Sequence, residues 1–200
     1  MSGPHPTPGV AVAELAHVRS LNAPRIRLEP LGPEHFDQVW PGLFDAEMLK
    51  LTGTRATFTE DAVRAHLERI GPAGDRADWA VLEASTGEYL GEIVLNELDE
   101  ENASMNVRIA LAPGRPGAGF GTEAMIAVLD HAFGGIGLHR VQLDVYAFNP
   151  RAIRSYEKAG FTVEGRQRDT LFWDGEWTDS ILMSVLADDA RPTWVHAPNR

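Results

Sequence analysis

Apolar and polar positions alternate in several short stretches, which is the period of a β-strand with one buried face. In the first half of the chain this pattern predicts strands at residues 25–28, 79–82, 89–98 and 105–111. Turn-forming residues separate the last three strands, STGE at 85–88 and DEEN at 99–102. The pattern therefore predicts an antiparallel meander that ends at residue 111.

Helical spacing replaces this alternation elsewhere. After a glycine-rich loop, apolar residues recur at i, i+3, i+4, i+7 and i+8, namely at Met125, Val128, Leu129, Ala132 and Phe133. Residues 33–51 also have a helical pattern, broken near Pro41 and Gly42. Thr59 is a candidate N-cap for a helix over 60–70. A further helix is predicted to begin at Asn149-Pro150 and to end at Gly160.

The remaining pattern predicts strands at 138–147, 161–171 and 177–186. In the first of these, Val141, Leu143 and Val145 share one face, whereas Gln142, Asp144 and Tyr146 share the other. We expect residues 1–24 to be a flexible leader with a short helix near 10–21. Residues 25–187 then form one mixed α/β domain, and residues 188–200 form a loose polar tail.

Composition narrows the class of protein. A chain of 200 residues with 44% apolar and 24% charged residues suits one soluble domain. The formal net charge of −11 disfavours nucleic acid as a partner, because proteins bind phosphates through Lys and Arg. A cationic partner, such as an amine or a basic protein tail, suits this charge. The acidity could equally serve solubility alone.

Several kinds of chemistry are excluded. The chain has no cysteine, which rules out disulfides, cysteine-bound zinc and a cysteine acyl-enzyme. The seven histidines lack metal-ligand spacing, so we expect no metal. No run of eighteen apolar residues and no signal-peptide pattern occurs. We therefore expect a cytoplasmic protein that does not enter a membrane.

The loop before the predicted helix points to a phosphate ligand. Gly117, Gly119 and Gly121 alternate at the helix start, where unpaired N–H groups and a partial positive charge attract anions. A Walker loop would need a lysine, and a dinucleotide fingerprint would need glycine where Thr122 stands. The alternative is a flexible loop, but each glycine costs a helix about 1 kcal/mol relative to alanine. A diphosphate cradle is the better hypothesis.

Two motifs resemble a known family. Residues 117–124 (GAGFGTEA) and 149–161 (NPRAIRSYEKAGF), together with His139-Arg140-Val141, resemble the GNAT superfamily of acyl-CoA-dependent N-acetyltransferases, and within it the RimJ/RimL type. The resemblance covers about residues 25–187. It departs from the family at Pro116, where a Gln, Arg or aromatic residue is usual. Arg115 either replaces that contact or is simply solvated.

This resemblance implies a fold and a set of roles. The fold is a central, mostly antiparallel twisted sheet of about seven strands, with helices on both faces and a splay in the middle at the acyl-CoA site. Backbone groups of Ile109 and Leu111, and the side chain of Asn149, would hold the pantetheine arm. The diphosphate would lie on Gly117, Gly119, Gly121 and Thr122. Tyr156 would be the general acid at the sulfur.

The bland alternatives are a core aromatic for Tyr156 and a helix cap for Asn149, and the cap is compatible with a ligand contact. Asp144 is the candidate general base, with Glu92 and Glu97 as rivals. Asp144 could instead form a structural ion pair with Arg140 or Arg108, and a water relay could leave no single base. Four residues of the 33–52 region are candidates for the acceptor wall or for core packing: Trp40, Phe44, Leu49 and Thr52.

The function implied is transfer of an acetyl group from acetyl-CoA to an amine, by direct attack in a ternary complex. The acceptor would be a protein N-terminus or a small-molecule amine, and the enzyme a monomer or homodimer. One alternative keeps the fold but acylates a small amine or antibiotic, or uses a longer acyl group. The other is a CoA-binding sensor without catalysis.

Overall fold

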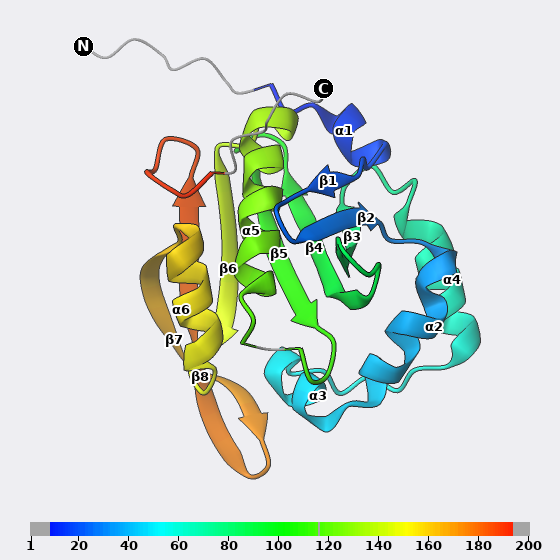
Figure 1. The fold of residues 1–200 in the computed structure, drawn as a ribbon. Helices are drawn as coiled ribbons and strands as arrows, with labels where there is room; N and C mark the ends of the chain where they lie inside the picture. Colours follow the sequence, from blue (N-terminus) through cyan, green and yellow to red (C-terminus); the bar gives the residue numbers. More distant parts are fainter. Residues whose placement is uncertain (1–8, 116, 194–200) are drawn as a thin grey trace.

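Eight strands form one sheet in the order β1-β2-β3-β4-β5-β6-β8-β7 (Figure 1). The structure is a computed structural model and describes residues 9–115 and 117–193. The strands are β1 (Leu21–Asn22), β2 (Ile26–Pro30), β3 (Ala77–Glu83), β4 (Tyr89–Asp99), β5 (Ser104–Leu111), β6 (Arg140–Tyr146), β7 (Thr162–Trp173) and β8 (Glu176–Leu186). Only the β5–β6 pair is parallel among the described strands. The mixed, mostly antiparallel fold is confirmed, with β1 as a short strand beyond those predicted.

Helices cover both faces of this sheet (Figure 1). On one face α5 (Phe120–His131) and the π-helical turn η3 (Ala132–Ile136) lie over the middle strands, and α6 (Pro150–Ala159) packs beside α5 on the side of β7 and β8. The buried residues of α5 include Met125, Val128 and Leu129, as their spacing predicts. The main core therefore lies between α5 and strands β3–β6.

The other face carries a smaller core under short helices. These are η1 (Pro33–His35), α2 (Phe36–Val39), η2 (Trp40–Phe44), α3 (Ala46–Thr52) and α4 (Glu60–Ile70). The pattern over 33–51 predicts one helix with a break near Pro41-Gly42, but the chain instead forms four short pieces. Asp45 begins the last of them by accepting the Met48 N–H at 2.8 Å. A polar cap at that point ends one helix and starts another.

Residues 9–24 pack on the domain, beyond the boundary at residue 25 that the pattern predicts. Helix α1 (Val12–Ala16) buries Leu15 completely, and β1 pairs with β2. The indole Nε1 of Trp79 donates to the Arg19 carbonyl at 2.9 Å. Near the C-terminal end of the described residues, Arg191 Nη2 lies 3.7 Å from Asp130 Oδ1, and the Arg191 guanidinium lies over the ring of Phe133. The expectations for residues 1–8, 116 and 194–200 lie outside the described residues.

The sheet opens between β5 and β6. These strands pair only through three residue pairs, from Ser104 with Arg140 to Asn106 with Gln142. Strand β5 nevertheless stays paired with β4 up to Leu111, and β6 stays paired with β8 up to Tyr146. The two strands therefore follow different neighbours and diverge. This is the splay expected from the family resemblance.

We predict that Thr59→Ala lowers the free energy of unfolding by about 1 kcal/mol. The Thr59 hydroxyl accepts the Ala62 N–H at 3.3 Å at the start of α4, and alanine leaves that N–H without its cap. Urea denaturation measures the change. Thr57→Ala, on an exposed residue two positions earlier, is the matched control. Equal stability of the two variants would contradict the cap.

Candidate active site

A pocket of about 440 Å³ occupies the splay between β5 and β6. Its walls come from β5, the glycine loop, the start of α5, β6, α6 and, on the far side, α3. All the site residues predicted from the sequence line this pocket: Ile109, Leu111, Gly117, Gly119, Gly121, Thr122, Asp144, Asn149 and Tyr156. The structure thus brings together side chains and loops from four separate parts of the chain.

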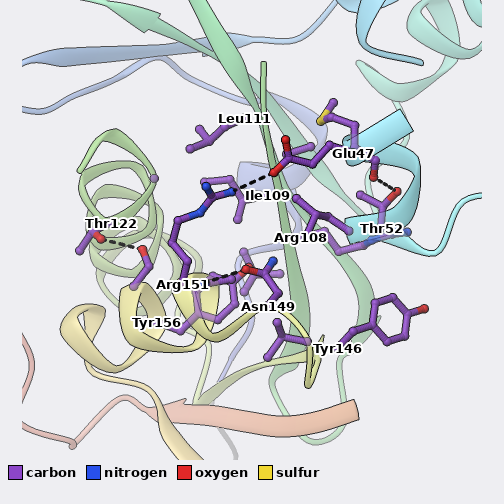
Figure 2. Close-up of a pocket in the computed structure, with 18 of the residues that line it drawn as sticks. Glu47, Thr52, Arg108, Ile109, Leu111, Thr122, Tyr146, Asn149, Arg151 and Tyr156 are labelled. Carbon is purple, nitrogen blue, oxygen red and sulfur yellow. Dashed lines mark hydrogen bonds and ion pairs between the residues drawn. The ribbon is translucent and has the colours of Figure 1, made fainter. Parts of the chain in front are cut away.

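Figure 2 shows the two sides of this pocket. Tyr156 and Asn149 lie on the α6 side, and Thr122 stands at the first turn of α5. Ile109 and Leu111 follow β5 through the middle. Residues of α3, among them Glu47 and Thr52, close the pocket opposite α6. We call this pocket the passage. The glycine loop (residues 117–121) lines it near one end, and α3 lines it near the other.

The glycine loop has the backbone geometry of an anion site. Gly117 and Gly119 have φ values of 100° and 86°, in the left-handed region that favours glycine, and Gly119 is the N-cap of α5. The Glu123 N–H bonds to the Gly119 carbonyl, so the earlier N–H groups of the first turn have no acceptor within the helix. A Cβ on Gly117 would meet no atom within 4 Å. The loop is therefore open toward the pocket and presents donors there.

An ion pair between the half-exposed Arg25 and the buried Glu123 holds this loop from behind. Arg25 Nε donates to Glu123 Oε2 at 2.8 Å, and the Arg25 backbone N–H donates to Oε1 at 2.6 Å. Arg25 Nη1 also donates to the Ala118 carbonyl at 3.0 Å, and the guanidinium lies over the Phe120 ring. Glu123 is only 4% exposed. Arg25 is thus bonded to both sides of the turn that starts α5, a role that sequence reasoning missed.

Neighbouring contacts clarify two further residues. Arg115 pairs with Glu88, so its side chain is engaged at the rim of the loop and is not simply solvated. The Thr122 and Ser155 hydroxyls hydrogen bond at 2.7 Å and join α5 to α6. The departure from the family pattern at Pro116 lies outside the described residues.

Tyr156 and Asn149 combine structural and chemical features. Burial, and secondarily the charge of Asp144, raise the pKa of Tyr156 to about 12. Its hydroxyl therefore stays protonated throughout the physiological pH range. The side-chain oxygen of Asn149 accepts the Ala152 N–H at 3.1 Å, which confirms the helix cap. The cap uses the oxygen of Asn149 and leaves the NH2 group for a second partner.

Asp144 lies at the edge of the pocket with its side chain exposed. Arg140 pairs instead with Glu164, at 2.8 Å between Nη1 and Oε1. Within the described ranges, neither Arg140 nor Arg108 forms an ion pair with Asp144. Burial first, and then the negative charge of Asp144, raise the pKa of both Tyr146 and Tyr156. The alternative of a structural ion pair with either arginine is therefore not found.

The two rival carboxylates differ in position. Glu97 lines the pocket at an irregularity in β4, where its φ of 56° marks a break in the strand pairing. Glu92 is half-buried, and its desolvation, then the charge of Asp78, raise its pKa. Glu92 is outside the set of residues that line the pocket. Asp144 and Glu97 are thus carboxylates that line the pocket, along with Asp45 and Glu47 of the α3 region.

The expected acceptor wall is only partly present. Of its four candidates, Thr52 lines the pocket. Trp40 instead stacks on Phe36 at 5.5 Å and meets Phe44 edge-on at 4.8 Å, in the smaller core. Met48 and Leu51 of α3 supply the apolar lining. An ion pair of 3.8 Å between Glu47 and Arg151 spans from α3 to α6 (Figure 2).

Residues 25–162 match the family model described as "Acetyltransferase (GNAT) domain". The chain belongs to this family. Spermidine N(1)-acetyltransferase of Vibrio cholerae is 31% identical over 106 residues, which are 53% of this chain and 61% of that protein. The Escherichia coli K12 protein of the same name is 30% identical over 100 residues, 50% of this chain and 54% of its own. The match thus spans about half to three fifths of each relative's length.

Solved structures extend the likeness of fold. Spermidine N-acetyltransferase from V. cholerae, in complex with CoA and spermine, superposes with a TM-score of 0.77 at 22% identity, covering 82% of this chain and 97% of that one. A GNAT-family acetyltransferase from Bacillus anthracis gives 0.74 at 20% identity, covering 85% and 99%. These similarities show a shared fold.

Two further observations bear on partners. None of the helices in the described ranges reaches the length and apolar character that crossing a bilayer requires. Within residues 9–115 and 117–193, no group of three or more His, Asp or Glu side chains is placed to hold a metal ion.

We predict that Arg25→Met lowers the free energy of unfolding by about 1–3 kcal/mol, because it leaves the buried Glu123 carboxylate without its main partner. The double variant with Glu123→Gln should recover part of this loss, since the remaining group is neutral. Urea denaturation of the four proteins in this cycle measures the coupling. Arg168→Met, on the exposed β7 strand, should change stability by less than about 0.5 kcal/mol. Additive losses in the cycle would contradict the ion pair.

Proposed function

We propose that this protein transfers an acetyl group from acetyl-CoA to an amine acceptor. The observation that carries the proposal is the splay of β5 from β6, which opens onto the glycine loop at one end and contains Tyr156. A passage of this kind suits a long, thin donor with a diphosphate at one end and a thioester in the middle of the sheet.

The residues along the passage suit the successive parts of such a donor, from the diphosphate to the pantetheine arm. The open loop at Gly117 and Gly119, with the N-terminal N–H groups of α5, suits a diphosphate. Beyond Asn106, β5 has lost β6 as a neighbour, so backbone groups near Ile109 and Leu111 are available to a pantetheine arm. Asn149 lines the same pocket, and the helix cap leaves its NH2 group available. These assignments support donor binding along β5.

The chemistry follows from the groups in the passage. A protonated amine is not nucleophilic, so Asp144, Glu97 or a water between them takes its proton. The amine nitrogen then bonds to the thioester carbon, and a free N–H of β5 stabilises the carbonyl oxygen. As the C–S bond breaks, the Tyr156 hydroxyl supplies a hydrogen bond or a proton to the sulfur. The nitrogen loses its second proton after the attack, and this proton replaces the one that Tyr156 gave to the sulfur; the first proton passes from the base to solvent.

The identity of the acceptor belongs to this proposal. Spermidine acetyltransferases among the relatives support a small amine, whereas the RimJ/RimL resemblance supports a protein N-terminus. A longer acyl donor would use the same passage. A CoA-binding sensor is the non-catalytic alternative, but Tyr156 and Asp144 in one pocket favour an enzyme. Isothermal titration with acetyl-CoA, followed by an acceptor screen that detects thiol release, tests the proposal.

We predict that Gly119→Glu weakens acetyl-CoA binding at least about 100-fold, because its Cβ would lie 3.3 Å from Arg25 Nη2, so that the loop must shift, and because the new carboxylate adds negative charge beside the diphosphate. Isothermal titration calorimetry measures the dissociation constant. Gly175→Glu is the matched control, since Gly175 has the same φ of 86° but lies in the β7–β8 turn. It imposes the same backbone strain away from the pocket. Equal affinities of the two variants would place the donor elsewhere.

We predict that Tyr156→Phe lowers kcat about 100-fold and leaves the dissociation constant of acetyl-CoA nearly unchanged, because only the hydroxyl is lost. In the wild type, a pKa raised to about 12 keeps Tyr156 protonated, so kcat should not fall between pH 7 and pH 10 through this group. Tyr146→Phe, in the same pocket, should lower kcat far less. Undiminished turnover in Tyr156→Phe would leave Tyr156 as a core aromatic.

A further inference from the structure

Arg108 is a cation that faces the pocket without a fixed partner. Its side chain is exposed, it lines the pocket from β5, and Figure 2 places it on the side nearer α3. Among the described residues, no carboxylate forms an ion pair with Arg108. An arginine carries five donors, so an unpaired one in a binding pocket is suited to an anionic group on a ligand.

Asp144 and Arg108 occupy corresponding positions on β6 and β5, just beyond the point where the pairing of these strands stops. Asn106 and Gln142 form the last pair of β5 with β6. Arg108 and Asp144 each lie two residues further on, and they therefore point to the same face of the sheet as that pair. Continued pairing would have made them neighbours, but the splay separates them. The β5 side of the passage thus carries the positive Arg108, and the β6 side carries the negative Asp144.

The electrostatic effects of the two residues agree with this arrangement. Burial raises the pKa of Tyr146; the charge of Asp144 adds to this rise, and the charge of Arg108 opposes it. Two other carboxylates of the mouth are already engaged. Asp45 accepts the Met48 N–H, and Glu47 pairs with Arg151. Among the described residues, Arg108 and Asp144 thus line the pocket with opposite charges and without an ion pair, and Glu97 is a third such group.

We propose that Arg108 is a specificity-determining residue that binds a carboxylate of the acceptor, while the acceptor's amine faces Asp144 and Tyr156. This inference rests on the proposed acetyl transfer and assigns its substrate class: amines that also carry a carboxylate. The carboxylate is unchanged in the reaction. The new bond is N–C, the broken bond is C–S, and the amine proton ends on the thiol. A polyamine would instead place a second ammonium beside the Arg108 guanidinium, where like charges repel.

The experiment compares matched acceptors with the full-length protein. Each set contains an amino acid, its primary amide and its decarboxylated amine, and spermidine and 1,4-diaminobutane are assayed beside them. We expect the highest kcat/KM for amines with a free carboxylate. Arg108→Gln should lower kcat/KM for these acceptors about 10-fold to 100-fold, the usual effect of a lost charge-assisted hydrogen bond. It should change the values for the decarboxylated amines less than about 3-fold.

Further variants separate charge from general damage. Arg108→Lys should retain part of the preference, and Arg108→Glu should reverse it toward the diamine. Arg168→Gln, on the exposed β7 strand, is the control and should resemble the wild type. The affinity for acetyl-CoA, measured by calorimetry, should be the same in all of these proteins.

The possible failures are distinct. Absence of acetyl-CoA binding by the wild type would overturn the proposed function itself. Acetyl-CoA binding with equal or better activity on decarboxylated amines or spermidine would overturn only the role of Arg108. So would a preference for the amides, or a loss in Arg108→Gln that is the same for every acceptor. Failure of every carboxylate-bearing amine to react, while other amines react, would have the same meaning.

Discussion

The structure depends on the early end of hydrogen bonding between β5 and β6. Backbone N–H and C=O groups need partners, and two adjacent parallel strands would ordinarily supply them to each other along their length. Here each strand stays bound to its outer neighbour, β4 or β8, after the shared pairing has stopped. The groups left over on the inner edges line a passage of about 440 Å³. The pocket thus exists because the regular pairing between β5 and β6 stops early.

The polar contacts around the passage hold its walls in place. The Arg25–Glu123 ion pair joins the entry of β2 to the start of α5, and the Thr122–Ser155 hydrogen bond joins α5 to α6. Both contacts act at the end where an anion would bind. At the opposite end the ion pair between Glu47 and Arg151 is exposed and longer. The glycine-loop end, where we propose that the donor binds, is therefore held by shorter contacts than the α3 end, where we propose that the acceptor binds.

Much of the local structure could be predicted because it depends on neighbouring residues. Thr59 and Asn149 cap the helices that their positions predict, and the alternation in β6 buries Val141, Leu143 and Val145. The splay and the gathering of the site residues came from the family motifs, because residues 107 and 156 are far apart in sequence. Whether each residue has its predicted chemical role stays a prediction.

Other features were not predictable from spacing. Arg25 and Glu123 lie 98 residues apart, and nothing in either local sequence indicates that they meet. The sequence allows Arg115 to be a ligand contact or a solvated group, but Arg115 pairs with Glu88 of the turn between β3 and β4. Trp40 and Phe44 are apolar aromatic residues that could form a pocket wall, yet Trp40 stacks on Phe36 and meets Phe44 edge-on. In each case a tertiary contact decided between uses that the local sequence allows equally.

The short β5–β6 pairing also has a mechanical consequence. It divides the sheet into a unit of β1–β5 and a unit of β6–β8, and in the described structure three residue pairs join the two along their shared edge. A seam with so few hydrogen bonds resists bending far less than the long ladders on either side of it. A small rotation about Ser104–Asn106 would widen or narrow the passage without breaking the pairing within either unit. Strand pairing alone thus joins the two units only through these three residue pairs, and the core between α5 and strands β3–β6 supplies the rest of the contact between them.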